Sequence, residues 1–139
     1  MREYALVFLV AAAVTYLLTV ASVALGVVVS FGARYLANLA AFWWLDARGA
    51  NTVWLICSTM LSGLAVPVAF FPEWARLVVW AATPFPWMFQ APLDILLERG
   101  GGGHQAVLLA GQLVAAVAVL VAGRVVQRAA VRTLVVQGG

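Results

Sequence analysis

The chain has 139 residues, of which 65% are hydrophobic and only 9% are charged. Soluble domains average about 45–50% apolar and about 25% charged residues, so the composition excludes an ordinary soluble domain and predicts an integral membrane protein. The net charge of +3 comes from arginines at segment ends rather than from a basic patch, which argues against nucleic-acid binding. Cys57 is the sole cysteine, which excludes an intrachain disulfide and a thiolate metal cluster.

The first apolar stretch runs from Ala5 to about Leu45, and its only charge is Arg34. We predict two membrane segments here, residues 5–20 and 22–45, arranged as a hairpin with Arg2 at the cytoplasmic end. One crossing needs about 20 predominantly apolar residues, so the stretch is long enough for two. Because no charged loop separates the segments, one long tilted helix with an interfacial stub is the alternative.

Small and polar side chains recur at four-residue steps within this stretch, which places them near one face of a helix. An arginine at bilayer depth costs about 2.5–3.5 kcal/mol on insertion scales, so Arg34 is expected to have a compensating partner. One interpretation is that these side chains only let neighbouring helices approach closely. The stripe consists of Ser22, Gly26, Ser30, Arg34 and Asn38.

Residues 51–71 form the next predicted membrane segment. It follows an aromatic cluster, Phe42, Trp43 and Trp44, which lies just before Asp46. Aromatic side chains beside a charged residue are typical of the interface between membrane and water. We therefore expect this cluster at the cytoplasmic interface.

The region of residues 72–103 is too apolar for a soluble loop and too often interrupted by proline for a membrane span. Each proline removes a backbone donor and disfavours the helical conformation in the residue before it. Irregular backbone at membrane depth needs cover from protein or a water-filled cavity. We therefore predict short re-entrant or interfacial helices over residues 77–82 and 93–97, with Arg76 and Arg99 as partners of the nearby carboxylates.

Residues 105–123 form the last predicted membrane segment. Arg124, Arg128 and Arg132 follow it at four-residue steps, so they share one helical face. The positive-inside rule places this end, and with it the C-terminus, in the cytoplasm. Gly100–His104 is then predicted to form an external glycine-rich turn, and residues 72–103 lie on the external side.

Several short motifs follow one another in order from about Ser22 to the end of the chain. With them the sequence resembles the C-terminal half of a permease from the type-2 ABC exporter group. Such permeases are usually much longer, so the resemblance implies that an N-terminal half is missing. The motifs are V-S-F-x-x-R-Y (29–35), A-F-W-W-L-D-A-R-G (41–49), L-S-G-x-x-V-P (61–67), F-F-P-x-W (70–74), T-P-F-P (83–86), Q-x-P-x-D-I (90–95) and L-V-V-Q-G-G (134–139).

The resemblance implies a permease subunit, or a fragment of one, in an ATP-driven exporter of the plasma membrane. Its partners would be an ABC ATPase, a second permease chain in a homo- or heterodimer, the missing N-terminal half and the lipid bilayer. The stripe at Ser22–Asn38 would line the export path or the interface with the second permease. The residues of an external gate would be Glu73, Trp74, Arg76, Pro84, Pro86, Asp94 and Glu98.

Two alternatives stay open, a truncated remnant without transport activity and a small helical membrane scaffold protein. We predict no enzyme activity and no catalytic, cofactor-binding or metal-binding residue. His104 has no second ligand near it in the sequence, and residues 100–103 lack the Gly-Lys-Ser/Thr ending of a phosphate-binding loop. Hydrolysis of ATP is therefore expected on another chain.

Overall fold

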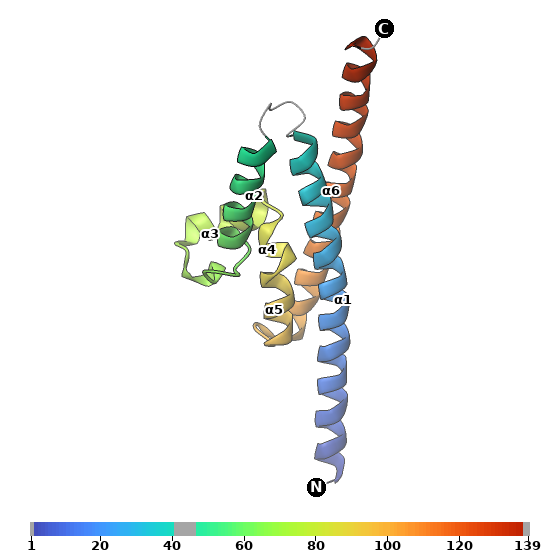
Figure 1. The fold of residues 1–139 in the computed structure, drawn as a ribbon. Helices are drawn as coiled ribbons and strands as arrows, with labels where there is room; N and C mark the ends of the chain where they lie inside the picture. Colours follow the sequence, from blue (N-terminus) through green and yellow to red (C-terminus); the bar gives the residue numbers. More distant parts are fainter. Residues whose placement is uncertain (1, 41–46, 138–139) are drawn as a thin grey trace.

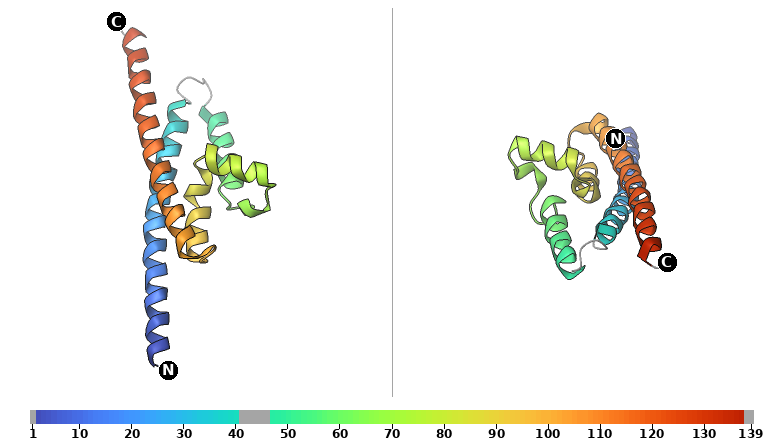
Figure 2. Two further views of the ribbon diagram at one scale, coloured as in Figure 1. Left: turned by 180° about the vertical axis from the view of Figure 1, so that it is seen from behind. Right: turned by 90° about the horizontal axis from the view of Figure 1, so that it is seen from above.

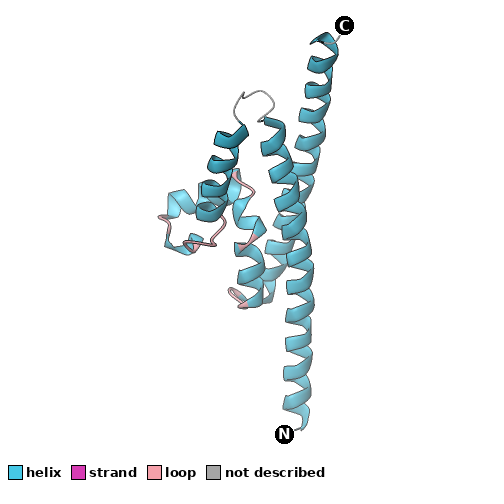
Figure 3. Ribbon diagram, viewed as in Figure 1, coloured by secondary structure: helices cyan, strands magenta, loops and turns pink. Residues whose placement is uncertain are grey.

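The computed structural model describes residues 2–40 and 47–137. The regular elements in these ranges are all helices, which confirms the predicted all-helical fold class (Figures 1 and 3). In chain order they are α1 (Arg2–Ala40), α2 (Ala47–Leu61), the 3-10 helix η1 (Val68–Phe70), α3 (Glu73–Ala82), α4 (Phe85–Met88), α5 (Gln90–Leu96) and α6 (Gly101–Gln137).

α1 is one uninterrupted helix of 39 residues. The predicted hairpin of segments 5–20 and 22–45 is not found; residues 2–40 adopt the single long helix that was the alternative. The physical reason is that this stretch contains no proline and no pair of adjacent glycines, so nothing in it opens the helical hydrogen-bond ladder. As a result Arg2 lies at the opposite end of the helix from Ala40 (Figure 1).

Within the described residues, two helices are long and apolar enough to cross a membrane, α1 over Glu3–Leu39 and α6 over Gly101–Arg132. At 1.5 Å per residue, the 39 residues of α1 span about 58 Å and the 37 residues of α6 about 55 Å. Both lengths exceed the roughly 30 Å of a bilayer's hydrocarbon core. The predicted total of four membrane segments is not confirmed and stays a prediction.

α2 ends at Leu61, ten residues before the end of the predicted segment 51–71. Its 15 residues span only about 22 Å. The helix stops because Gly63 takes a left-handed conformation, with φ +87°, and because Pro67 cannot donate a backbone hydrogen bond. The aromatic cluster Phe42, Trp43 and Trp44 lies outside the described residues.

The prolines of the region 72–103 mark helix starts. Pro72 precedes the first residue of α3, Pro84 precedes α4, and Pro86 occupies its first turn. Pro92 lies in the first turn of α5, where its missing N–H has no helical partner to lose. The region therefore forms three short helices rather than the two that were predicted.

The connection between α5 and α6 comes earlier than expected. The turn consists of residues 97–100, with left-handed conformations at Glu98 (φ 51°) and Gly100 (φ 83°). α6 already begins at Gly101, so the prediction of a turn over Gly100–His104 was wrong for its last four residues. Glycine lowers helix propensity by about 1 kcal/mol relative to alanine without forbidding a helix, and the glycines here extend a very long one.

α1 and α6 pack side by side and run in the same direction (Figures 1 and 2). Gln112 contacts Ser22, and Val119, further along α6, lies against Gly32 of α1. Residue numbers therefore increase in the same direction along both helices, so the pair is parallel. This places the N- and C-terminal ends of the chain at opposite ends of the molecule (Figure 2).

The buried positions of the two helices repeat in steps of three and four residues. This repeat forms one buried seam on each helix, which faces the other long helix at Ser22 and Gln112 and the α4–α5 segment at Gly26 and Leu108. α4 and α5 pack against this pair from one side, where Ala91, Ile95 and Leu108 form a small apolar core. The seam consists of Ser22, Gly26, Val29 and Ala33 on α1, and of Leu108, Gln112, Ala116 and Val119 on α6.

Candidate functional site

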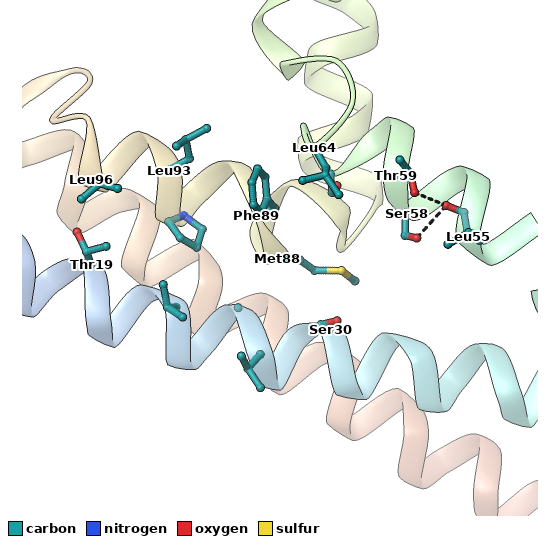
Figure 4. Close-up of a pocket in the computed structure, with 15 residues that line it drawn as sticks. Thr19, Ser30, Leu55, Ser58, Thr59, Leu64, Met88, Phe89, Leu93 and Leu96 are labelled. Carbon is teal, nitrogen blue, oxygen red and sulfur yellow. Dashed lines mark hydrogen bonds between the residues drawn. The ribbon is translucent and has the colours of Figure 1, made fainter.

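A groove of about 610 Å³ lies between α1, α2 and the α4–α5 segment (Figure 4). α1 forms its floor over residues 19–30, α2 and the segment directly after it form one wall over residues 55–64, and residues 88–96 form the other wall. The lining residues are Thr19, Val23, Gly26, Val27, Ser30, Leu55, Ser58, Thr59, Ser62, Leu64, Met88, Phe89, Pro92, Leu93 and Leu96.

The polar groups of the groove are all neutral hydroxyls. None of the described lining residues carries a charge. Three of the hydroxyls donate to carbonyls of their own helices: Thr19 to Thr15 at 2.8 Å, and Ser58 and Thr59 to Leu55 at 3.1 and 2.7 Å (Figure 4). The walls therefore offer a ligand an apolar surface with few free donors.

The predicted stripe on α1 does not stay on one face of the bundle. Ser22 and Gly26 are buried, whereas Ser30, Arg34 and Asn38 are exposed. A step of four residues advances a helix by about 400°, so such a stripe drifts by about 40° per step. Its first members consequently face α6 and α4–α5, Gly26 and Ser30 line the groove, and the last two lie outside it.

Gly26 allows the closest approach of α1 to the α4–α5 segment. A Cβ at this position would lie 2.6 Å from the carbonyl oxygen of Met88 and 3.6 Å from the ring of Pro92. Such a contact with backbone is too short to exist, so a side chain here would push the two elements apart. The packing interpretation of the stripe therefore applies at Gly26.

A fully buried glutamine joins three elements at the centre of the molecule. Gln112 of α6 is 0% exposed and accepts a hydrogen bond from the Ser22 hydroxyl at 2.6 Å. Its amide nitrogen donates to the Ser22 carbonyl at 3.1 Å and to the Trp87 carbonyl at 2.8 Å. Gln112 thus joins α1, α4 and α6. Sequence analysis missed it, although an amide in the middle of the apolar run 105–123 was a visible signal.

A second buried glutamine organises the predicted external region. Gln90 is 2% exposed; its side-chain oxygen accepts from the Val68 N–H at 3.5 Å and its amide nitrogen donates to Asp94 at 2.8 Å. Asp94 in turn accepts from Arg99 at 3.0 Å, which confirms Arg99 as a carboxylate partner. The chain of bonds runs from the segment after α2, through α5, to the turn before α6.

The remaining residues of the predicted gate are scattered. Glu73, Trp74 and Arg76 lie exposed on α3, away from Asp94. Pro86 is buried, and the Glu98 carboxylate accepts a hydrogen bond from the Thr15 hydroxyl of α1 at 2.5 Å. The structure therefore joins Glu98 to α1 and buries Pro86, bonds Asp94 to Gln90 and Arg99, and leaves the three α3 residues exposed. Pro84 is half-buried at the start of α4.

Two tryptophans of this region, Trp80 and Trp87, pack against each other instead of standing exposed on the surface. The rings of Trp80 and Trp87 meet edge to face with centroids 4.7 Å apart, and the Trp87 indole N–H donates to the Trp80 carbonyl at 3.0 Å. Both are half-buried, whereas Trp74 is 71% exposed. Of the three, only Trp74 is placed like an interfacial anchor.

Replacement of Gln90 by Met is expected to lower the free energy of unfolding by about 1 kcal/mol, because the Val68 N–H and the Asp94 carboxylate each lose a partner. The measurement is unfolding in mixed detergent and SDS micelles, followed by circular dichroism. Arg99→Ala is the comparison: its ion pair is half-exposed on the arginine side, so a smaller loss is expected. Equal stability of Gln90→Met and the unaltered chain would contradict the assignment of these bonds.

No group of three His, Cys, Asp or Glu side chains placed to hold a metal ion occurs within residues 2–40 and 47–137. A family model described as ABC-2 family transporter protein matches residues 1–138. The match includes the first 21 residues, which carried none of the motifs. No curated protein and no solved structure matches the chain.

Proposed function

The chain belongs to the ABC-2 family of transporter proteins, and we propose that it is a permease subunit of an ATP-driven exporter. Proteins of this family are membrane components of transporters, and the ATPase is a separate subunit. The observation that carries the proposal is the family match over residues 1–138, together with two helices long enough to span a membrane.

We further propose an orientation with the C-terminal end of α6 in the cytoplasm. Arg124 and Arg128 are exposed beyond the apolar part of α6, as the positive-inside rule requires for a cytoplasmic end. Because α1 runs parallel to α6, Ala40 and Arg48 lie on this side too, and the turn at Glu98 lies outside (Figure 1). Arg2 then belongs to the external side, opposite to its place in the hairpin.

In this orientation α5 and the turn at Glu98 lie toward the external side, where they would act as a gate at the exit, whereas α4 lies level with the middle of α6, since Trp87 bonds to Gln112. The bonds of Gln112 and Gln105 support this proposal, since Gln112 holds α4 against α1 and α6 and the Gln105 amide donates to the Ile95 carbonyl of α5. The partners in transport would be an ABC ATPase and a second permease chain. Residues Ser30, Arg34 and Asn38, which are exposed on α1, would face such a chain.

The proposal is tested by purification of the tagged chain from its own cells in mild detergent. We expect it to carry an ABC ATPase with it, and the complex to hydrolyse ATP. Changing the phosphate-loop lysine of that ATPase should abolish hydrolysis and leave the complex intact. A chain that purifies without any ATPase, or a complex without ATP hydrolysis, would contradict the permease function and favour a scaffold protein.

Arg34→Ala is expected to reduce the amount of ATPase complex that is recovered, or to stop export. The reason is that an exposed arginine within an apolar helix needs a compensating partner, which a neighbouring permease chain would supply. The amounts of chain and ATPase recovered are compared with those of Arg128→Ala, which removes an exposed arginine beyond the apolar run. Normal recovery and normal export of Arg34→Ala would remove any role for this part of the stripe.

A further inference from the structure

Glu98 occupies the turn between α5 and α6 in a backbone conformation that is unusual for its type. Its φ is 51°, and no other non-glycine residue of the described ranges 2–40 and 47–137 has a positive φ. In this left-handed region the Cβ atom crowds the backbone carbonyl, so a glutamate is strained where a glycine is not. Such a conformation persists only where surrounding contacts hold it in place.

The side chain of Glu98 makes such a contact with α1. Its carboxylate accepts a hydrogen bond from the hydroxyl of Thr15, 83 residues away, at 2.5 Å. A length of about 2.5–2.7 Å is typical of a hydroxyl that donates to a carboxylate, which is one of the stronger kinds of hydrogen bond. The next residue, Arg99, pairs with Asp94 at 3.0 Å. Glu98 is thus bonded to a distant helix and not to its charged neighbour.

Thr15 departs from the pattern that the other threonines follow. Within residues 2–40 and 47–132, each other threonine hydroxyl donates to the carbonyl four residues earlier, a common bond of threonine in helices. Thr15 alone of this set donates to another element. Its own helix offers the carbonyl of Ala11 at the corresponding position, so rotation about one side-chain bond gives the hydroxyl a second acceptor. The other threonines are Thr19, Thr52, Thr59 and Thr83, with bonds of 2.8, 3.1, 2.7 and 2.6 Å.

The chain after Glu98 contains residues that can change conformation easily. Gly100 and Gly101 both have positive φ, 83° and 76°, and two more glycines follow in the first turn of α6. Glycine adopts left- and right-handed conformations with similar ease, so these residues can absorb a rearrangement of residue 98. Before the turn, α5 ends at Leu96, which lines the groove together with Thr19 of α1 (Figure 4). A movement of the turn would therefore change the separation of α5 and α1.

We propose that Glu98 and Thr15 form a latch that holds the α5–α6 turn, and with it the end of α5, against α1. In the latched state the carboxylate of Glu98 accepts from Thr15 and residue 98 is left-handed. In the open state the Thr15 hydroxyl donates to the carbonyl of Ala11, water hydrates the exposed carboxylate, and residue 98 becomes right-handed. Opening replaces the bond between the two residues and releases backbone strain, so the two states lie close in free energy.

The latch would control the exit, because α5 belongs to the proposed gate, and this step rests on the proposed export function. Glu98 then acts as a positioning residue that keeps α5 on α1. The latch itself requires only the bond to Thr15 and the geometry of the turn, so it is testable without transport.

The latch is tested by hydrogen–deuterium exchange of the purified chain in lipid nanodiscs, followed for peptides that contain residues 97–101. Thr15→Val keeps the shape of the side chain but removes the hydroxyl, so the turn should exchange several-fold faster. Thr15→Ser keeps the donor and should exchange like the unaltered chain. The matched control is Thr19→Val, because the Thr19 hydroxyl donates within α1, to the Thr15 carbonyl. Equal exchange in Thr15→Val and Thr19→Val, with normal helix content, would overturn the latch.

Variants of Glu98 separate the bond from the strain. Glu98→Ala and Glu98→Gly both remove the carboxylate, but only alanine retains the strain of the left-handed conformation. After correction for intrinsic rates, both should exchange faster than the unaltered chain, and Glu98→Ala the fastest. Thr15→Val combined with Glu98→Ala should exchange no faster than Glu98→Ala alone, since both changes break the same bond. Additive effects would show that the two residues act independently and would overturn the proposal.

The role in the gate is tested by cross-linking in the complex with the ATPase. Thr15→Cys and Glu98→Cys are introduced together in a Cys57→Ser background and treated with a short bifunctional methanethiosulfonate. We expect the cross-link to form without nucleotide and its yield to fall several-fold during ATP hydrolysis. An equal yield in both conditions would mean a permanent contact and would overturn the latch as a control on the gate. Failure to recover any ATPase would contradict the proposed function instead, and the exchange of residues 97–101 would still decide the latch.

Discussion

Replacement of Gln112 by Met is expected to destabilise the protein by about 2 kcal/mol and to loosen α4 from the helix pair. The change keeps the length of the side chain but removes three hydrogen bonds at a site with no exposure to solvent. It leaves the hydroxyl of Ser22 and the carbonyl of Trp87 buried without their partner. A buried polar group without a partner costs about 1–3 kcal/mol, and this penalty exceeds the value of the bond itself.

The matched control for this change lies on the same helix. Gln127→Met alters an exposed glutamine of α6 and should change the free energy of unfolding by less than about 0.5 kcal/mol. Both variants are unfolded in mixed detergent and SDS micelles, and the near-ultraviolet circular dichroism of the tryptophans reports the loosening around Trp87. Equal stability of the two variants would contradict the assignment of Gln112 as the residue that joins α1, α4 and α6.

Gly26→Ala is expected to destabilise the protein by about 2 kcal/mol, within the range of about 1–3 kcal/mol that is typical of overpacking. The added methyl group would meet the carbonyl oxygen of Met88 at 2.6 Å. Because that atom belongs to the backbone, no side-chain rotation relieves the clash, and α1 has to move away from α4. The bonds of Gln112 to Ser22 and Trp87 would stretch in consequence, so the two changes should not be additive.

Gly103→Ala is expected not to destabilise the protein, in contrast to Gly26→Ala. No heavy atom of a neighbouring residue lies within 4 Å of a Cβ at Gly103, which is in the first turn of α6. Alanine favours a helix over glycine by up to about 1 kcal/mol, so this variant should be as stable as the unaltered chain or more stable. A loss for Gly103→Ala as large as that for Gly26→Ala would show that flexibility, rather than the clash, explains the effect.

The helical fold followed from the sequence, because composition acts locally, but the helix starts did not: α3 and α5 begin at Glu73 and Gln90 rather than at residues 77 and 93, and α4 was not predicted. Pro72, Pro84 and Pro86 lie where α3 and α4 begin, as their fixed φ and missing donor require. Periodicity could not decide whether residues 5–45 form one helix or two, because a hairpin and a single long helix have the same apolar composition. The absence of proline and of adjacent glycines favoured one helix, and the structure shows it over residues 2–40.

The site was harder to predict, since its residues come from distant parts of the chain. The stripe beginning at Ser22 was assigned a strict four-residue step, whereas packing against α6 follows steps of three and four and continues through Val29 and Ala33. Gln90 and Gln112 were visible as amides in apolar surroundings. Most of their partners, however, belong to other elements, the Val68 N–H for Gln90 and Ser22 and the Trp87 carbonyl for Gln112, and no sequence pattern specifies these pairings.

The central claim of this account is that α1 and α6 are parallel spans whose C-terminal ends share the cytoplasmic side. Single cysteines placed in a Cys57→Ser background test it directly in intact cells with a membrane-impermeant maleimide. The positions are Glu3 at the start of α1, Gly102 at the start of α6, and Arg128, which is exposed near the other end of α6.

We expect Glu3→Cys and Gly102→Cys to react in intact cells, and Arg128→Cys to react only after the membrane is permeabilised. Protection of Glu3→Cys together with Arg128→Cys would contradict the parallel pair and restore the hairpin of residues 5–45. Reaction of Arg128→Cys from outside would reverse the proposed orientation, and with it the external position of α5 and the Glu98 turn.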